Sequence, residues 1–524
     1  MVELYHPMRS RNRLSQQEAG SSSSRQEAGS GATSRCSAAP MQASLLAAQG
    51  LPRAPLPPSG SGRGAGAGFA ASWFSVLCTM VGTGILGLPY SVKQGGWAAV
   101  GLIVLVALMT NHTGKILVGC MYRAAAVERL AGFPAIARVA FGPRGVYVVQ
   151  IFHKATLIGV CTLYLILAGR FLTEGIGGGG DGLFSGLGSP ASASSWTSSW
   201  ILVSALVVWV PVVSVETLGE IAPVTILGAF SSALTVVATV AVAAAVYPVT
   251  SASTDLLPLS KEFVNSNASA VSHQFLNLET MPSAFSAITL SFGGHSCFPS
   301  LEAGMADPRQ FNAVLDWAFL TMVLMYTLIA SVGYGIFGDE TQSPILSNLP
   351  VEGGLATVVC LVKLVVALSV FCSYPILMNV MVLELEEALN VRSPVSTADT
   401  DNGDTWESSA TQTVGTGQGQ GLWQRRRREY LVRRTILRSC CVGVTAVIAV
   451  LVPFFMEMMG LIGSCCLGVI VFILPVLFDW RLRMLHGDVI ERWRWVSGGV
   501  IIVTGLVGGG IGAVQSIQAI YDNL

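Results

Sequence analysis

Two short stretches of the sequence place glycine, hydroxyl and proline residues inside runs that are otherwise apolar. The first is Val81-Gly-Thr-Gly-Ile-Leu-Gly-Leu-Pro-Tyr90, and the second is Ile288-Thr-Leu-Ser-Phe-Gly-Gly-His-Ser-Cys-Phe-Pro299. Glycine and proline weaken a helix, and hydrocarbon offers no water to the backbone groups that a weakened helix leaves unpaired. Each stretch therefore predicts a broken membrane helix whose break faces protein or water, which is typical of a binding site.

Such breaks can solvate a small zwitterion. A helix that begins again after Gly82-Thr-Gly84 offers free N–H groups and about half a positive charge to a carboxylate. Carbonyl groups freed at the two breaks can accept hydrogen bonds from an ammonium group. Close packing of small residues between helices is the alternative interpretation of the glycines. The predicted substrate-binding residues in the breaks are Val81, Gly82, Thr83, Gly84, Ser291, Phe292, Gly293 and Gly294.

Two basic side chains are candidates for proton coupling. His295 lies in the second break, and an imidazole titrates near ~6.5, so it could take a proton from an acidic compartment and release it to a neutral one. The alternative is a packing histidine that hydrogen-bonds the unwound segment. Lys363 is placed within a later apolar run, where an ionisable group is a candidate for coupling or gating.

The composition requires a membrane for most of the chain. Of 524 residues, 52% are apolar and 11% are charged, against about 25% charged residues in soluble proteins. A run of ~20 apolar residues is long enough to cross a bilayer. The eleven predicted spans cover residues 70–92, 97–122, 146–170, 197–215, 221–247, 282–301, 314–337, 354–383, 436–456, 460–479 and 496–520.

The spans predict an all-α membrane protein with an inverted repeat. The breaks fall in spans one and six, at matching positions of two five-span halves, which is the pattern of inverted-repeat transporters. Residues 1–68 are polar and rich in Ser, Gly and Arg, and we expect a disordered cytosolic tail. Residues 69–524 form the transmembrane domain, with a second disordered cytosolic loop at 386–435.

The basic residues predict the orientation. Of 30 Lys and Arg residues, 24 fall in segments on the side of the N-terminus, so the N-terminus is expected in the cytosol and the C-terminus in a lumen or outside the cell. Asn267-Ala-Ser269, in a long loop on the far side, is a candidate glycosylation site. The sequence shows no metal-ligand cluster, catalytic triad or phosphate-binding loop, so an enzyme is not expected, and neither is a nucleic-acid-binding protein.

Several motifs along the chain resemble the amino acid/auxin permease family, in order and at family-like spacing over nearly all of 69–524. The stretch Phe298-Pro-Ser-Leu-Glu-Ala-Gly-Met-Ala-Asp-Pro308 is most similar to vacuolar amino acid transporters and to the vesicular inhibitory amino acid transporter. The other matching pieces are Gly82 to Tyr90 with Gly95-Gly-Trp97, Phe133 to Gly142, Tyr164 to Gly169, Phe292 to His295, Gly333 to Gly338, Ile345 to Pro350, Ser373-Tyr-Pro375 and Leu461 to Ser464.

The resemblance implies a LeuT-type fold, with an inverted five-plus-five repeat and an eleventh transmembrane helix. It also implies that Tyr164 and Ser373 line the substrate pocket, although both could be ordinary packing residues. Sodium-coupled members of the family carry an Asn where this chain has Cys78. Because a thiol is a poor ligand for a hard cation, we expect protons rather than sodium as the coupling ion, with no cofactor.

Together these observations predict proton-coupled transport of amino acids, of the neutral class, by alternating access. Exchange of lumenal protons for cytosolic amino acid at a vacuole-like membrane is the first hypothesis. A plasma-membrane proton/amino acid symporter is the second. A sensor that binds an amino acid and signals through its cytosolic tails is an alternative of another class. The expected partners are the amino acid and the lipid bilayer.

Overall fold

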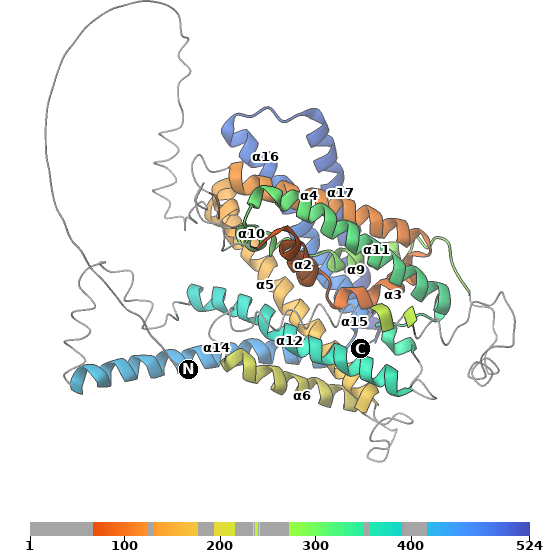
Figure 1. Ribbon diagram of the computed structural model, residues 1–524, viewed down its shortest axis with the longest axis horizontal. Helices are drawn as coiled ribbons and strands as arrows, with labels where there is room; N and C mark the ends of the chain where they lie inside the picture. The colour runs from red at the N-terminus through yellow and green to blue at the C-terminus, as the bar shows by residue number, and fades with distance from the viewer. Residues whose placement is uncertain are drawn as a thin grey trace, which may run out of the picture. The chain divides into compact units, whose positions relative to one another are not determined.

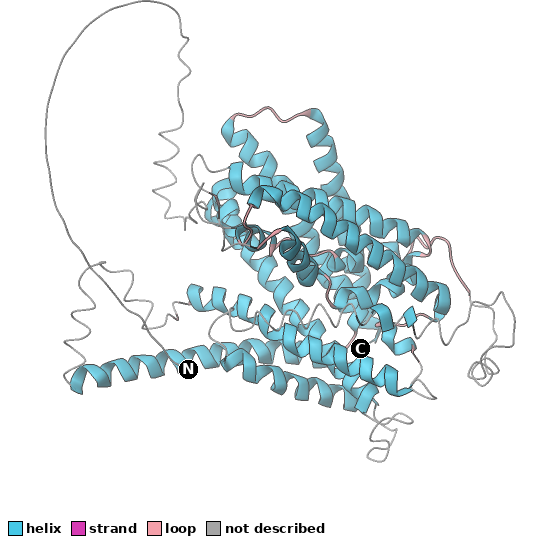
Figure 2. Ribbon diagram, viewed as in Figure 1, coloured by secondary structure: helices cyan, strands magenta, loops and turns pink. Residues whose placement is uncertain are grey.

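The computed structural model describes residues 67–123, 129–130, 132–176, 193–214, 234, 236–238, 240–241, 272–349, 356–389, 391 and 417–523. In these ranges the regular structure is helical (Figure 2). Eight of the helices are long and apolar enough to cross a membrane, or nine if the bent pair at 69–95 counts as one span. An all-helical, multi-pass membrane protein is confirmed.

The helices follow one another along the chain as coloured in Figure 1. They are α2 (Phe69–Met80), the 3₁₀ turn η1 (Thr83–Gly87), α3 (Leu88–Gly95), α4 (Ala98–Arg123), α5 (Phe133–Ile176), α6 (Ala193–Ser214), α9 (Met281–Ser291), α10 (Phe298–Ala303), η5 (Pro308–Gln310), α11 (Phe311–Phe337), η6 (Gly338–Glu340), η7 (Ile345–Asn348), α12 (Ala356–Ala388), α14 (Gly417–Leu451), α15 (Phe455–Ile462), the π-helical η8 (Gly463–Ile473), α16 (Leu474–His486) and α17 (Arg492–Asn523).

Both predicted helix breaks are confirmed. Helix α2 ends at Met80, the chain passes through η1, and the two helical parts of this span are bent by 53°. Helix α9 ends at Ser291, and α10 begins only at Phe298 with Pro299 in its first turn. Proline is tolerated there because the first N–H groups of a helix have no partner within it. The glycines and prolines therefore mark both interruptions.

The third span is longer than expected. Helix α5 runs from Phe133 to Ile176 instead of 146–170, and its backbone leaves the helical region at Gly142, where φ is 69° and ψ is −160°. A positive φ is accessible to glycine at little cost, and Pro143 starts the second helical part. The segment before Gly142 is thus a short helix joined to the span by a sharp kink.

Part of the expected loop at 386–435 is helical, because α14 begins at Gly417. Ion pairs hold the part of this helix that adjoins the start of the predicted span. The Arg438 Nε lies 2.9 Å from the Glu386 Oε1 of α12, and the Arg434 Nε lies 3.7 Å from the same oxygen. At its other end α14 stops at Leu451 instead of 456, two residues before Pro453.

Several expectations fall on residues outside the described ranges. They include most of the fifth span at 221–247, the candidate glycosylation site Asn267, nearly all of the tail at 1–68 and the part of the loop between 392 and 416. The last residues of the tail are described, and Ala67 exchanges backbone hydrogen bonds with the chain after α10, at Gly304 and Ala306.

A stripe of small residues lets α17 approach its neighbours closely. Its buried positions are Gly498, Ile501, Gly505, Gly509, Gly512 and Ser516. A methyl group added at Gly512 would lie 2.1 Å from the Ser286 Oγ and 2.6 Å from the Pro282 carbonyl oxygen of α9. Small residues at helix contacts are typical of membrane proteins, where packing replaces the hydrophobic effect. The stripe therefore holds α9, the helix that enters the second break.

We expect Gly512→Ala to lower the melting temperature of the purified protein in detergent. The added methyl group meets a backbone carbonyl, which cannot rotate away, and overpacking of this kind costs about 1–3 kcal/mol. Gly510→Ala is the matched control, because a methyl group there meets nothing within 4 Å and alanine favours the helix by about 0.5–1 kcal/mol. Equal melting temperatures for both variants would contradict the close contact of α17 with α9.

Candidate functional site

The two helix breaks lie directly against each other. A methyl group at Gly84 would lie 2.8 Å from the Ser291 Oγ and 2.9 Å from the Ser291 Cα. A methyl group at Gly294 would lie 2.6 Å from the Cγ of Met80. Glycine is thus required on each side for the segments to touch, and the structure brings the two predicted halves of the substrate site together.

A tyrosine that the sequence analysis missed joins the two breaks. The Tyr326 hydroxyl of α11 donates to the Ser291 carbonyl oxygen at 3.0 Å and lies 3.4 Å from the Met80 carbonyl oxygen. These carbonyl groups stand at the ends of α9 and α2, where the regular helix stops. Tyr326 is fully buried, and its ring lies 5.0 Å from that of Phe292. Tyrosine in a long apolar helix gave no sequence signal that it would reach a break.

Other predicted residues surround this contact. A methyl group at Gly82 would lie 3.6 Å from the Tyr164 hydroxyl of α5, and one at Gly293 would lie 2.7 Å from Leu467 of η8. Val81 and Phe292 are buried. Thr83 is the first residue of η1, so its backbone lies in the break as predicted. The site is therefore enclosed by α5, α11 and η8 around the two breaks.

His295 is fully buried between the second break and α4. Its Nε2 lies 3.0 Å from the Thr113 Oγ1, while its Nδ1 has no hydrogen-bond partner among the described residues. The Thr113 Oγ1 also lies 3.1 Å from the carbonyl oxygens of Met109 and Thr110 in its own helix, and the acceptor that takes its single proton sets the tautomer of His295. In the tautomer whose Nε2 donates to Thr113, the Nδ1 lone pair is a free acceptor.

Lys363 does not join the site at the breaks. It is the eighth residue of α12, so it lies about 10 Å from the start of that helix at 1.5 Å per residue, and its side chain is buried. Its Nζ lies 3.0 Å from the Glu174 Oε2 near the end of α5. Glu174 also pairs with Arg170 at 3.0 Å and accepts from Ser347. Lys363 belongs to this separate ion-pair network.

Ser373 is half-buried on α12, and nothing in the structure tests its predicted contact with substrate. The next residue, Tyr374, is fully buried and shares a hydrogen bond of 2.7 Å with Thr445 of α14. This contact directs the Tyr374 side chain toward α14. The role of Ser373 stays a prediction.

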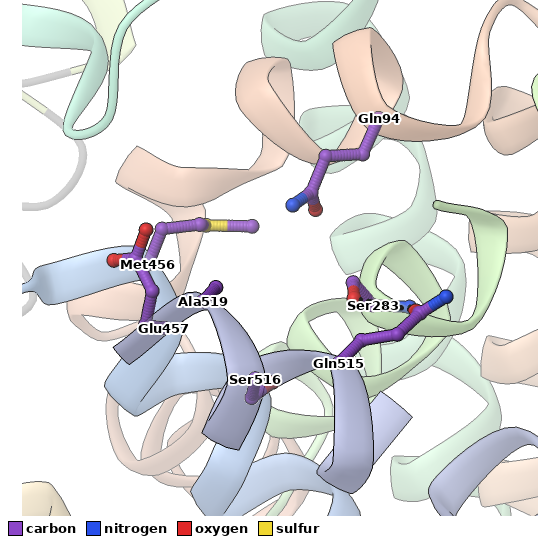
Figure 3. Close-up of a pocket in the computed structure, with 8 residues that line it drawn as sticks. Gln94, Ser283, Met456, Glu457, Gln515, Ser516 and Ala519 are labelled. Atoms are coloured by element: carbon purple, nitrogen blue, oxygen red, sulfur yellow. Dashed lines mark hydrogen bonds between the residues drawn. The ribbon is translucent and has the colours of Figure 1, made fainter. Parts of the chain in front are cut away.

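A small polar cavity lies beyond the breaks, where α3 ends, α9 and α15 begin and α17 ends (Figure 3). Its volume is about 40 Å³, enough for a few water molecules. Gln94 lies ten residues after Gly84, or about 15 Å along a helix. The residues that line the cavity are Gln94, Ser283, Met456, Glu457, Gly460, Gln515, Ser516 and Ala519.

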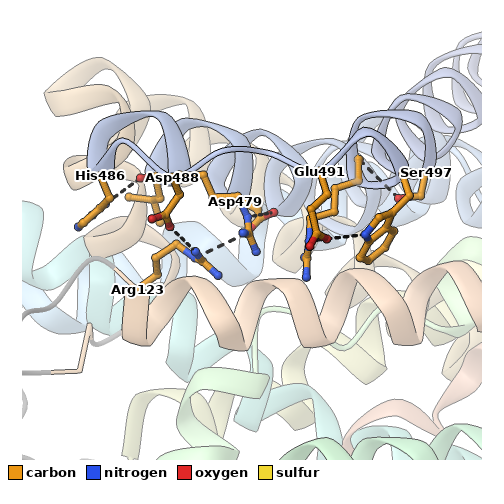
Figure 4. A network of polar contacts seen from close by, with 10 residues as sticks. Arg123, Asp479, His486, Asp488, Glu491 and Ser497 are labelled. Atoms are coloured by element: carbon orange, nitrogen blue, oxygen red, sulfur yellow. Dashed lines mark hydrogen bonds and ion pairs between the residues drawn. The ribbon is translucent and has the colours of Figure 1, made fainter.

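Ion pairs cluster near the C-terminal end of α4 (Figure 4). Arg123, its last residue, lies 2.8 Å from Asp488 and 3.8 Å from Asp479 of α16. Nearby, the buried Arg129 lies 2.6 Å from the buried Glu302 of α10, which also accepts from the Tyr122 hydroxyl. These contacts tie the helix that leaves the second break to α4.

Comparison with known proteins identifies related sequences over most of the chain. A family model described as transmembrane amino acid transporter protein matches residues 65–518. The human vesicular inhibitory amino acid transporter is 26% identical over 479 residues, covering 87% of this chain and 80% of the relative. The Arabidopsis thaliana amino acid transporter AVT1C is 26% identical over 452 residues, covering 86% and 69%.

Solved structures are also similar to this chain. The crystal structure of MhsT in complex with L-phenylalanine covers 87% of this chain and 100% of its own, with a TM-score of 0.48 and 12% sequence identity.

We expect Tyr326→Phe to destabilise the protein. Removing the hydroxyl leaves the Ser291 carbonyl oxygen without this donor in a buried site, at a cost of roughly 1–2 kcal/mol. The measurement is the melting temperature in detergent. Tyr521→Phe is the control, because Tyr521 is 80% exposed and loses nothing buried. If both variants melt like the unmodified protein, the hydroxyl does not stabilise the paired breaks.

Proposed function

Because this chain belongs to the transmembrane amino acid transporter protein family, we propose that it moves amino acids across a membrane, coupled to protons, by alternating access. The observation that carries the proposal is the direct contact of the two breaks, Gly84 on Ser291 and Gly294 on Met80. Two interrupted helices that meet between apolar spans supply fixed dipoles of both signs, which is what a zwitterion needs when it leaves water.

The proposed binding mode follows from these dipoles. The substrate carboxylate faces the N–H groups of the helical turn that begins at Thr83, where the helix dipole is positive. The ammonium group takes the carbonyl oxygens of Met80 and Ser291, which the Tyr326 hydroxyl now approaches. Since Gly84 and Ser291 leave no space between them, the breaks must separate before a substrate can enter. Tyr326 is therefore the group that an incoming ammonium displaces.

We place His295 on the coupling pathway, because it adjoins the second break and its Nδ1 has no hydrogen-bond partner in the part of the chain that the structure describes. Lys363 is the weaker candidate, since Glu174 neutralises it at 3.0 Å. Cys78, at the position where the resemblance implies an Asn in sodium-coupled relatives, favours protons over sodium. The LeuT-type inverted repeat with an eleventh helix is part of the same proposal, with α17 as the eleventh helix.

The membrane that houses the protein is proposed to be that of an acidic organelle. The names of the vesicular inhibitory amino acid transporters support an endomembrane site, and the basic residues favour a cytosolic N-terminus. Protons that leave the lumen would then drive cytosolic amino acids into the lumen. Imaging a tagged full-length chain against organelle and surface markers tests this, and a surface location would favour the plasma-membrane symporter instead.

The transport proposal is tested with the purified chain in proteoliposomes that are acidic inside. We expect a radiolabelled neutral amino acid to accumulate, and a protonophore to abolish the accumulation. Gly84→Ala should reduce uptake by about tenfold, because an overpacking cost of about 1–3 kcal/mol falls on the contact of the breaks and 1.4 kcal/mol is a factor of ten. Gly101→Ala is the control, since a methyl group there meets nothing within 4 Å.

Other outcomes separate the alternatives. A chain that binds labelled amino acids in detergent but never accumulates them would favour a sensor. Accumulation that survives the protonophore and requires sodium would contradict proton coupling. If Gly84→Ala and Gly101→Ala transport equally well, the two breaks are not the substrate site.

A further inference from the structure

The polar cavity between α3, α9, α15 and α17 contains one charged side chain among the residues that line it, Glu457. This residue lies in the first turn of α15 and is half-buried. It is also the single charged residue in the sequence between Arg438 and Asp479. It lies in the turn between the predicted spans 436–456 and 460–479, at the start of a helix and beside a cavity with room for water, where protons can reach it.

The other polar groups of the cavity show what Glu457 can interact with. The Oε1 of Gln94 is buried and has no hydrogen-bond partner among the described residues, and Figure 3 shows the Gln94 side chain pointing from α3 into the cavity. Gln515 is already engaged, because its Oε1 accepts from the backbone N–H and the hydroxyl of Ser283 at 3.1 and 2.7 Å. Its Nε2 donates to the Glu279 carbonyl oxygen.

The Gln94 Oε1 and an ionised carboxylate are both acceptors, so an ionised Glu457 can pair only with the amide nitrogen of Gln94 and leaves that oxygen without a donor. Once Glu457 carries a proton, its hydroxyl is a donor, and it can satisfy Gln94 directly or through a water molecule. The Gln515 oxygen already accepts two hydrogen bonds. Gln94 is therefore the amide of the lining that can accept a hydrogen bond from protonated Glu457, directly or through a water molecule.

The neighbouring helices α3 and α5 carry other charged or titratable side chains near this end of the bundle. On α3, the Tyr90 hydroxyl lies within electrostatic range of Glu457, and Lys93 lies over the Tyr90 ring at 5.1 Å while its Nζ donates to the Thr341 carbonyl oxygen. Arg170 of α5 donates to the Ser343 carbonyl oxygen and forms an ion pair with Glu174. Helices α9 and α17 contribute uncharged side chains to the lining.

We propose that Glu457 is a proton-binding residue, and that its protonation couples to the movement of the two broken helices. The proposal rests on the transport function proposed above and gives it a second protonatable group besides His295. The cavity is bounded by α3, which leaves the first break, and by α9, which enters the second. A proton that joins Glu457 to Gln94 changes the attraction between α15 and α3, and so biases whether α3 can move.

The first test measures proton binding itself and requires no transport. Infrared difference spectra of the reconstituted full-length protein, recorded between acidic and neutral pH, should contain a carboxylic acid band that Glu457→Gln lacks. Glu340→Gln is the matched control, because Glu340 is an exposed carboxylate of η6 outside the cavity. A spectrum of Glu457→Gln identical to that of the unmodified protein would overturn the proposal, whether or not the chain transports amino acids.

The second test measures coupling in proteoliposomes. Glu457→Gln should lower accumulation driven by a pH gradient by roughly 5- to 150-fold, the range of ordinary coupling between two ligands. Exchange of labelled for unlabelled amino acid, with no gradient, should stay within about twofold of the unmodified protein, because that exchange needs no net proton movement. Glu340→Gln should match the unmodified protein in both assays.

Three outcomes would overturn the coupling role of Glu457. Unchanged accumulation by Glu457→Gln in a pH gradient would show that no proton need bind there. Equal loss of both activities in a protein that still elutes as a folded species would assign Glu457 to the substrate path. If Glu457→Gln removed a dependence of transport on sodium and not on protons, the cavity would be assigned to sodium. A failure of the transport proposal would differ from all three, because the unmodified protein would show neither activity.

Discussion

The backbone of this protein must satisfy its own polar groups wherever a helix stops inside the apolar layer. Two helices stop there, at Met80 and at Ser291, and each end would expose carbonyl groups that lipid cannot hydrogen-bond. The structure resolves this by placing the two ends together under a single hydroxyl, that of Tyr326. The site thus exists because the two interruptions need a common polar neighbour.

This requirement explains why glycine occurs where the helices meet. A hydroxyl can serve two chain segments only if their backbones approach closely, and a side chain at Gly84 or Gly294 would keep them apart. Glycine is also required between η8 and α9, because a methyl group added at Gly463 would lie 1.9 Å from the Ser286 carbonyl oxygen. Close backbone packing then supplies the dispersion energy that the hydrophobic effect does not provide between helices in lipid.

Much of this could be predicted from the sequence, because glycine and proline in an apolar run identify a break locally. The side chain that joins the two breaks could not be predicted, because Tyr326 becomes relevant only when α11 is known to lie beside both segments. Glu457 carries a signal in the sequence, as the single charged residue between Arg438 and Asp479, but the residues that surround it in the cavity could not be predicted. The helical part of 417–435 has no apolar signal, and its Arg434 pairs with Glu386 on another helix, a contact that the sequence does not reveal.

The buried charges divide the bundle into parts of different stiffness. Arg438 is fully buried and joins three helices, because it pairs with Glu386 of α12 at 2.9 Å and donates to the Val212 carbonyl oxygen of α6 at 2.6 Å. In Figure 1 these helices run beside α14. Breaking a buried ion pair leaves an uncompensated charge and is strongly unfavourable, so α6, α12 and α14 are expected to move as one body.

Three helices next to the breaks are held by weaker contacts. Helices α2, α3 and α9 pack against α11 or α17 through glycine contacts and through hydrogen bonds of the Tyr326 hydroxyl and the Gln515 side chain. Contacts of that kind can be exchanged for contacts with a substrate of similar polarity, because each hydrogen bond contributes only about 0.5–1.5 kcal/mol net. A rigid set of helices beside a set joined by replaceable contacts is the physical condition for a site that opens on one side at a time.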